Sequence, residues 1–207
     1  AHEGPPLLRS LKRVLASPTL TASTPVTLGE QSFSVLEVLT SYLRHLKAEL
    51  AKQDVDISRA RAVVAVPAHA YGAQRLLTLE AFQQAGFCVA AMLNEPSAAG
   101  FEYTHRKATT VSSKRTRVLV YDLGGGTFDT SLVDVVGTSH EVLASHGLGD
   151  LGGDDVDLLM ATNVLNRAGI AEEDLSPTEL DDLLDQCRDA KEHLTPQSRR
   201  VLIILRG

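Results

Sequence analysis

The chain has 207 residues, of which 43% are hydrophobic and 22% are charged, so it is large enough to bury the core of one or two domains. Its formal net charge of −6 argues against a nucleic-acid partner, which would favour a basic surface. No apolar run reaches the ~18 residues of a membrane span, and residues 1–6 carry no basic or apolar signal region. We therefore expect no membrane association and a cytoplasmic location.

Helically spaced leucines alternate with short β-branched runs through the first half of the chain. In chain order they predict a short helix from Pro6, a loop with a hairpin around Gly29, a helix from Ser34 to Gln53, a strand over 62–66, a helix closed by Gly86, a strand over 87–93 and a helix from Pro96 to about His105. Residues 106–117 are polar and basic, which predicts a connector there.

The second half repeats this alternation. It predicts an antiparallel meander of strands over 118–122, 127–136 and 141–146, helices over 153–168 and 177–194, and a last strand over 200–205. Strands interleaved with helices indicate an α/β fold. Cys88 and Cys187 fit no metal or redox spacing, and we expect both to be buried, reduced thiols.

The run Asp122-Leu-Gly-Gly-Gly-Thr-Phe-Asp129 carries the strongest chemical signal of the sequence. Its three glycines lack a Cβ, so the backbone can approach a ligand closely and present N–H groups to an anion. The two flanking aspartates supply carboxylates, which can hold a divalent cation through its waters. A glycine-rich hairpin bend is the alternative for the glycines alone, whereas the whole pattern predicts a site for a phosphate chain carrying Mg²⁺.

These eight residues resemble the second phosphate-binding segment of the seventy-kilodalton heat-shock chaperone family (the DnaK type). Four more motifs follow the order and approximate spacing of that family: Ala65-Val-Pro-Ala68, Gly72-Ala-Gln-Arg75, Asn94-Glu-Pro-Ser-Ala-Ala99 and Leu151-Gly-Gly-Asp-Asp155. The resemblance implies part of an actin-like, ribonuclease-H-like ATPase domain. Residues 1–112 would then belong to lobe I and residues 113–207 to lobe II.

The resemblance also implies ATP or ADP with Mg²⁺ as the bound group, and it suggests a role for each matching residue. Asp122 and Asp129 would hold the hydrated metal, while Lys12 and Glu95 would act on the attacking water. From spacing alone, a solvated helix lysine and a glutamate that complements a helix dipole remain the alternatives. The residues expected to contact the nucleotide are Gly124, Gly125, Gly126, Thr127, Gly152, Gly153, Lys191 and Thr195.

Pro67 and Arg75 resemble the pair that reports nucleotide state to the peptide-binding domain in this family. A strand-terminating proline and an ordinary surface arginine are the alternative. The chain departs from the family at two places. Residues 69–72 read His-Ala-Tyr-Gly where the family usually has aromatic residues and an acid, and Arg188 stands where it usually has a glutamate that meets the adenosine.

An opening Asp-Leu-Gly-Thr-Thr segment and a late Gly-Gly-Ser segment of the family do not occur in the chain. We therefore interpret the chain as a middle fragment that binds ATP weakly by itself. The resemblance implies a whole protein in which slow ATP hydrolysis gates a separate peptide-binding domain. Its expected partners are extended peptide clients, a J-domain co-chaperone and a nucleotide-exchange factor.

Two other functions remain open on the sequence. One is a kinase on the same actin-like scaffold, which would need a substrate-binding acid in the first lobe. The other is a nucleotide-gated interaction module that has lost hydrolysis, an alternative that Arg188 and the altered loop at 69–72 keep open.

Overall fold

The computed structural model describes residues 8, 11–53, 60–106, 116–137 and 139–204. The chain divides into two compact units. Unit 1 comprises Ala1–Asp122 and Asp129–Leu148, and unit 2 comprises Leu123–Phe128 and Gly149–Gly207. The expected lobe boundary near residue 112 stays a prediction, because compactness alone does not define the lobes of an ATPase domain. Most of the expected connector, at residues 107–115, lies outside the described residues, as does the expected helix start near Pro6.

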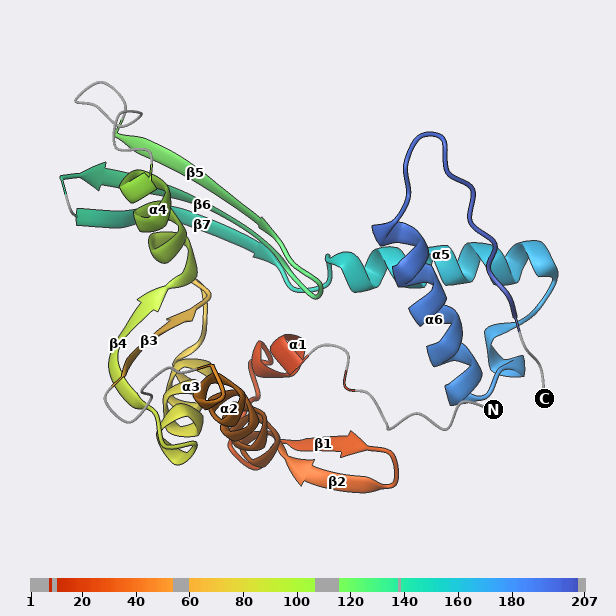
Figure 1. Cartoon of the computed structure of the whole chain (residues 1–207), viewed down its shortest axis with the longest axis horizontal. Coiled ribbons are helices and arrows are strands. Elements are labelled where there is room, and N and C mark those ends of the chain that lie inside the picture. Colours follow the sequence, from red (N-terminus) through yellow and green to blue (C-terminus); the bar gives the residue numbers. More distant parts are fainter. Residues whose placement is uncertain (1–7, 9–10, 54–59, 107–115, 138, 205–207) are drawn as a thin grey trace. The chain divides into compact units, whose positions relative to one another are not determined.

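Unit 1 begins with a short helix, a hairpin and a long helix (Figure 1). These elements are α1 (Leu11–Leu15), β1 (Pro25–Leu28), β2 (Gln31–Ser34) and α2 (Val35–Ala51). The strands β1 and β2 pair antiparallel, and Gly29 takes a φ of 61° in the turn between them, a conformation that favours glycine.

A capping box fixes the start of α2. The Ser34 hydroxyl accepts a bond from the Glu37 amide, and the Glu37 carboxylate accepts one from the Ser34 amide at 2.8 Å. Hydrogen bonds from the Ser34 side chain and backbone hold the pKa of the Glu37 carboxyl below its usual value. The helix then buries a leucine-rich face in a core shared with α3, whose buried members include Val35, Leu39, Leu43, Leu77 and Ala81.

A parallel βαβ unit follows, built from β3 (Arg61–Val66), α3 (Gly72–Gln84) and β4 (Cys88–Asn94). Gly86 turns the chain from α3 into β4 with a φ of 82°. Because β3 and β4 run parallel, their carboxyl ends meet at one edge of the sheet, where Pro67 and Glu95 follow directly.

The remaining elements of unit 1 are α4 (Glu95–Arg106) and a three-stranded sheet with the order β5-β6-β7. The strands are β5 (Arg117–Leu123), β6 (Phe128–Val136) and β7 (Ser139–Leu148), and α4 lies against the sheet (Figure 1). The Phe101 ring packs edge-on against His140, with 5.5 Å between ring centroids. A Cβ on Gly100 would lie 3.6 Å from Val133, an ordinary van der Waals distance, so this packing does not require glycine there.

Unit 2 packs α5 (Gly153–Ala168) against α6 (Pro177–Glu192), with a short 3₁₀ turn, Glu172–Asp174, between them. Gly169 ends α5 in the left-handed conformation, and Ser176 begins α6 with a second capping box. The core between the two helices contains Ala161, Leu165, Leu183 and Cys187.

Two expectations for the end of unit 2 are wrong. Helix α6 ends at Glu192 rather than 194, because His193 leaves helical geometry and Pro196 disfavours a helical Thr195. Residues 200–204 form no regular strand. Instead, the Gln186 amide holds Ile203, donating to its carbonyl at 2.9 Å and accepting from its N–H at 2.8 Å. One side chain thus replaces the strand partner that this segment lacks among the described residues.

Cys88 and Cys187 are both free, but only Cys187 is buried, so the expectation of two buried thiols is wrong for Cys88. Burial, with a smaller contribution from the Asp157 charge, raises the pKa of the Cys187 thiol.

We expect Cys88 to be alkylated at least ~10 times faster than Cys187 in the folded protein, because the thiolate is the reactive form. Peptide mass spectrometry after timed iodoacetamide labelling measures the ratio, which should approach one in denaturant. Similar native rates would contradict the buried position of Cys187.

Among the described helices, none combines the length and the apolarity needed to cross a membrane.

Candidate functional site

Three of the expected carboxylates line one pocket in unit 1. The pocket has a volume of about 150 Å³ and lies where β4 passes into α4, beside β5 and β6. Its carboxylates are Glu95, Asp122 and Asp129, and its other lining residues are Pro67, Ala68, Pro96, Ala99, Val120, Tyr121 and Ser131. The structure therefore brings together residues from α4, β5, β6 and the loop after β3.

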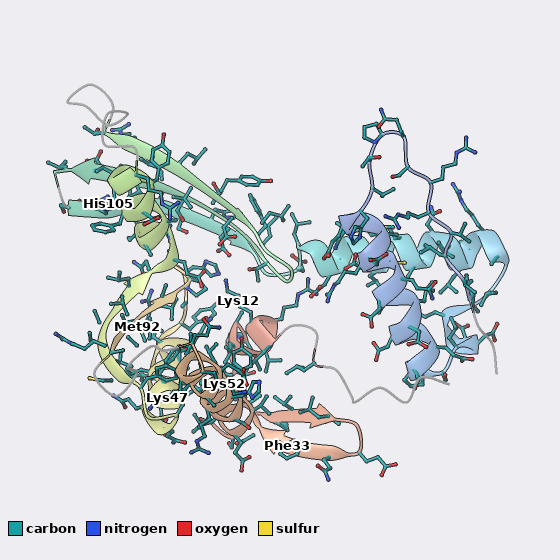
Figure 2. All side chains as sticks on the ribbon, viewed as in Figure 1. Lys12, Phe33, Lys47, Lys52, Met92 and His105 are labelled. Atoms are coloured by element: carbon teal, nitrogen blue, oxygen red, sulfur yellow. The ribbon has the colours of Figure 1, made fainter. Side chains whose placement is uncertain are left out.

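Lys12 reaches the same group of side chains from α1. Its Nζ lies 3.0 Å from Glu95 Oε2 and donates a hydrogen bond to it. Both side chains keep partial access to solvent, 42% for Lys12 and 26% for Glu95. Figure 2 shows Lys12 on α1, the short helix that carries it. The ammonium is thus held by a carboxylate of the pocket, and its catalytic role stays a prediction.

The Asp129 carboxylate is the most enclosed acid of the pocket, with its side chain 13% exposed. Its Oδ1 atom is buried and accepts no hydrogen bond from any described residue. His69 Nδ1 lies 3.0 Å from this oxygen but outside hydrogen-bond geometry, and the contact is an ion pair only when the imidazole is protonated. A buried carboxylate oxygen with spare acceptor capacity, close to the exposed Asp122, fits a cation. Within the described residues, no group of three or more His, Cys, Asp or Glu side chains could hold a metal ion directly.

Arg75 clamps the segment that links β3 to α3. Its Nη2 donates to the carbonyls of Pro67 and Ala68, both at 3.3 Å, and to Asn94 Oδ1 at 2.8 Å. Its Nε donates to the Ala70 carbonyl at 3.2 Å. The expected pair of Pro67 and Arg75 is therefore in direct contact. Arg75 also contacts Asn94, which directly precedes Glu95 of the pocket. Arg75 makes more contacts than an ordinary surface arginine, which was the alternative interpretation. The role of the pair in coupling stays a prediction.

In unit 2 the glycine turn is held by the first residues of α5. The Gly124 amide donates to the Thr127 carbonyl at 2.9 Å. The amides of Gly153 and Asp154 donate to the carbonyls of Gly124 and Gly125, at 3.0 and 2.7 Å. Two N–H groups at the N-terminus of α5 are thus engaged in holding this turn. A direct role for Gly152 and Gly153 toward a nucleotide stays a prediction.

Gly152 touches the backbone of the glycine turn. A Cβ there would meet the Gly125 carbonyl and lie 2.8 Å from the Gly126 carbonyl carbon. The φ of −167° at Gly152 is extended backbone, so glycine is required by the close approach rather than by the dihedral angle.

Gly152→Ala is expected to destabilise unit 2 by about 1–3 kcal/mol, the range for overpacking against atoms that cannot move freely. Gly149→Ala is the matched control, because a Cβ there meets nothing within 4 Å. Hydrogen exchange of the α5 amides measures both changes. Equal protection in the two variants would show that the turn moves aside at no cost.

Two cations of α6 pair with acids of α5. Arg188 lies 2.6 Å from Asp154 Oδ1 and 3.6 Å from Asp157 Oδ2, and Lys191 lies 2.7 Å from Asp157 Oδ1. Lys191 also donates to the Gly153 carbonyl at 2.8 Å. Asp157 is 2% exposed, a depth at which an acid needs a charged partner.

The same network shows what the motifs missed. Arg188 and Lys191 lie on one face of α6, but Thr195 lies beyond the end of that helix, in an exposed turn with Ser198. Asp154 and Asp157 were not identified as partners of these cations. Their spacing of three residues, which matches that of Arg188 and Lys191, was the available signal.

A carboxylate pocket at the carboxyl ends of parallel strands, in a chain that also carries a fixed glycine turn, is typical of phosphate-handling α/β domains. Comparison with known proteins identifies the class further, because residues 12–205 match the model of the family described as Hsp70 protein. The chain belongs to the Hsp70 family and is part of its actin-like ATPase domain. The family and the fold class that the motifs predicted are therefore confirmed.

Individual relatives agree with this assignment. The chain is 43% identical over 140 residues to a chaperone protein HscA homolog of Burkholderia pseudomallei (strain 668), an alignment that covers 67% of the chain and 22% of the relative. It is 39% identical over 178 residues to a chaperone protein HscA homolog of Laribacter hongkongensis (strain HLHK9), covering 86% and 27%. The chain spans about a quarter of the length of these curated relatives.

Proposed function

We propose that this chain is the part of a chaperone that binds Mg²⁺-ATP and carries residues for its slow hydrolysis. The observation that supports this most is the convergence of Glu95, Asp122 and Asp129 on one pocket, with Lys12 paired to Glu95. The named relatives are chaperone proteins of the HscA type, which agrees with the proposal.

Bound Mg²⁺-ATP supplies a phosphoryl group that can be transferred to water. Asp122 and Asp129, whose Oδ1 has no hydrogen-bond partner among the described residues, would hold the metal ion through its waters. The Lys12 ammonium stabilises negative charge that develops during transfer, and Glu95 keeps that ammonium oriented. In unit 2, the residues assigned to the nucleotide are Gly124, Gly125, Gly126, Thr127, Gly152, Gly153, Lys191 and Thr195.

Coupling to the rest of the protein passes through the segment from Pro67 to Arg75. Pro67 lines the pocket, and Arg75 holds the Pro67 carbonyl. A change at the pocket therefore reaches this segment through a few direct contacts. In the whole protein we propose that the segment reports nucleotide state to a peptide-binding domain, with a J-domain co-chaperone and a nucleotide-exchange factor as further partners.

Asp122→Asn tests the proposal. In the whole protein it is expected to lower kcat for ATP hydrolysis about tenfold or more at saturating Mg²⁺, because one lost charge contact in the transition state is worth at least ~1.4 kcal/mol. The control is Asp134→Asn, the same substitution on β6 but outside the pocket lining. Steady-state phosphate release measures both. If the Asp122→Asn variant hydrolysed ATP at the wild-type rate, the role assigned to Asp122 would be wrong.

One observation favours a second function, a nucleotide-gated module without hydrolysis. Arg188 takes the place of an expected glutamate and is engaged with Asp154, which leaves the adenosine side of the site altered. A wild-type protein that binds Mg²⁺-ADP but releases no phosphate would favour this module. The kinase alternative has no remaining support, because the matched family is Hsp70.

A further inference from the structure

We propose that His69 is a positioning residue that competes with a hydrated cation for the Asp129 carboxylate and so ties metal loading to the conformation of the segment from Pro67 to Arg75. This inference rests on the proposed function, because it assumes that Asp129 faces a metal ion. It adds a residue to which neither the motifs nor the family match gave a role.

The pairing of His69 with Asp129 is built into three elements of unit 1. His69 follows β3, Asp129 belongs to β6, and Gly147 of β7 lies against both. A Cβ on Gly147 would lie 2.6 Å from His69 Cε1 and 2.7 Å from Asp129 Oδ1. The imidazole therefore occupies space that only a glycine at position 147 leaves open.

His69 approaches the one Asp129 oxygen that has spare acceptor capacity. Its Nδ1 lies 3.0 Å from Oδ1, which accepts no hydrogen bond from the rest of the described chain. A water of a bound cation needs the same oxygen at a similar distance. This oxygen is buried, so a metal-bound water reaches it only when a covering group moves, and the half-exposed His69 ring 3.0 Å away is a group that can move.

Displacement of the ring removes one of the contacts that hold the segment from Pro67 to Arg75 in place. His69 lies between Pro67 and Ala70, whose carbonyls both accept bonds from Arg75. The His69 side chain is 45% exposed, so it can turn into solvent without leaving a buried cavity. Without the metal, the segment is held by the contact of His69 with Asp129 and by the hydrogen bonds of Arg75. With the metal bound, only the hydrogen bonds of Arg75 remain.

The test uses the whole protein, a fluorescent ADP analogue and a titration of Mg²⁺. His69→Ala removes the competitor, and we expect the Mg²⁺ concentration for half-maximal nucleotide binding to fall about two- to fivefold, the range for a partly exposed ion pair. In an Asp129→Asn background the same substitution is expected to change nothing further. His45→Ala is the control, since it removes an exposed histidine that lies 4.0 Å from Glu49 on α2, outside the pocket. His69→Gln, which keeps a donor near Asp129, is expected to lie between wild type and His69→Ala.

A second measurement follows the segment itself. Hydrogen exchange of a peptide covering residues 67–75 is expected to rise in the wild type when Mg²⁺ is added to the ADP complex, and to be independent of Mg²⁺ in His69→Ala. An unchanged Mg²⁺ midpoint in His69→Ala, or an equal shift in the Asp129→Asn background, overturns the inference. Should His69→Ala fail to fold, an unshifted midpoint in His69→Gln overturns it equally. A wild type without Mg²⁺-dependent nucleotide binding is a different result, since it removes the proposed function and the inference with it.

Discussion

Lys12→Ala in the whole protein is expected to lower the rate of ATP hydrolysis about a hundredfold or more, while ATP affinity changes little. Lys12 is held 3.0 Å from Glu95 in the group of side chains around the carboxylate pocket. An ammonium aimed at a reacting phosphoryl group matters most when charge moves in the transition state, and losing one such contact costs about 10²–10³ in rate. Binding in the ground state is shared among many backbone contacts and so depends less on one side chain. Single-turnover hydrolysis and nucleotide affinity, measured on the same preparation, separate the two effects.

The control for Lys12→Ala is Lys52→Ala. Lys52 lies at the end of α2 and pairs with Glu49 at 2.6 Å (Figure 2). The control substitution therefore also breaks a lysine–glutamate contact, but outside the pocket. Its expected effect on hydrolysis is negligible. If the Lys12→Ala protein bound ATP poorly but kept the wild-type rate of the chemical step, the catalytic role assigned to Lys12 would be wrong.

The elements that the sequence predicted well are those with a local cause. The leucine period of α2, its capping residue Ser34, and the turn glycines at 29 and 86 each act over a few neighbouring residues. Their physical consequences need no knowledge of distant parts of the chain. The meeting of Pro67 and Glu95 was predictable for a related reason, because parallel strands deliver their carboxyl ends to one edge.

The features that the sequence did not predict depend on contacts between distant residues. The approach of His69 to Asp129 joins positions 60 apart, and it requires the missing side chain of Gly147 on a third element. The burial of Asp157 depends on which face of α5 meets the two cations of α6. A β-branched run also predicted a strand at 200–205, but a strand needs a partner, and at Ile203 a Gln186 amide takes that place.

Leu183→Ala is expected to destabilise unit 2 by about 2–5 kcal/mol, the range for truncating a fully buried leucine. Leu183 is 1% exposed and lies in the core that joins α5 to α6, beside Ala161, Leu165 and Cys187. The same interface positions Lys191 and the amides of Gly153 and Asp154 that hold the glycine turn. A loss of packing there is therefore expected to loosen the turn as well.

The measurement for Leu183→Ala must report on unit 2 alone, because two compact units need not unfold in one step. Hydrogen exchange of the α5 and α6 amides meets this need, and a loss of 2 kcal/mol corresponds to a fall in protection of about 30-fold, since each 1.4 kcal/mol is a factor of ten. Leu194→Ala is the matched control, because this leucine is 53% exposed and lies just past the end of α6. Its expected change is within about 0.5 kcal/mol. Equal protection in the two variants would mean that α5 and α6 are not held together by this core, and the glycine turn would then need another support.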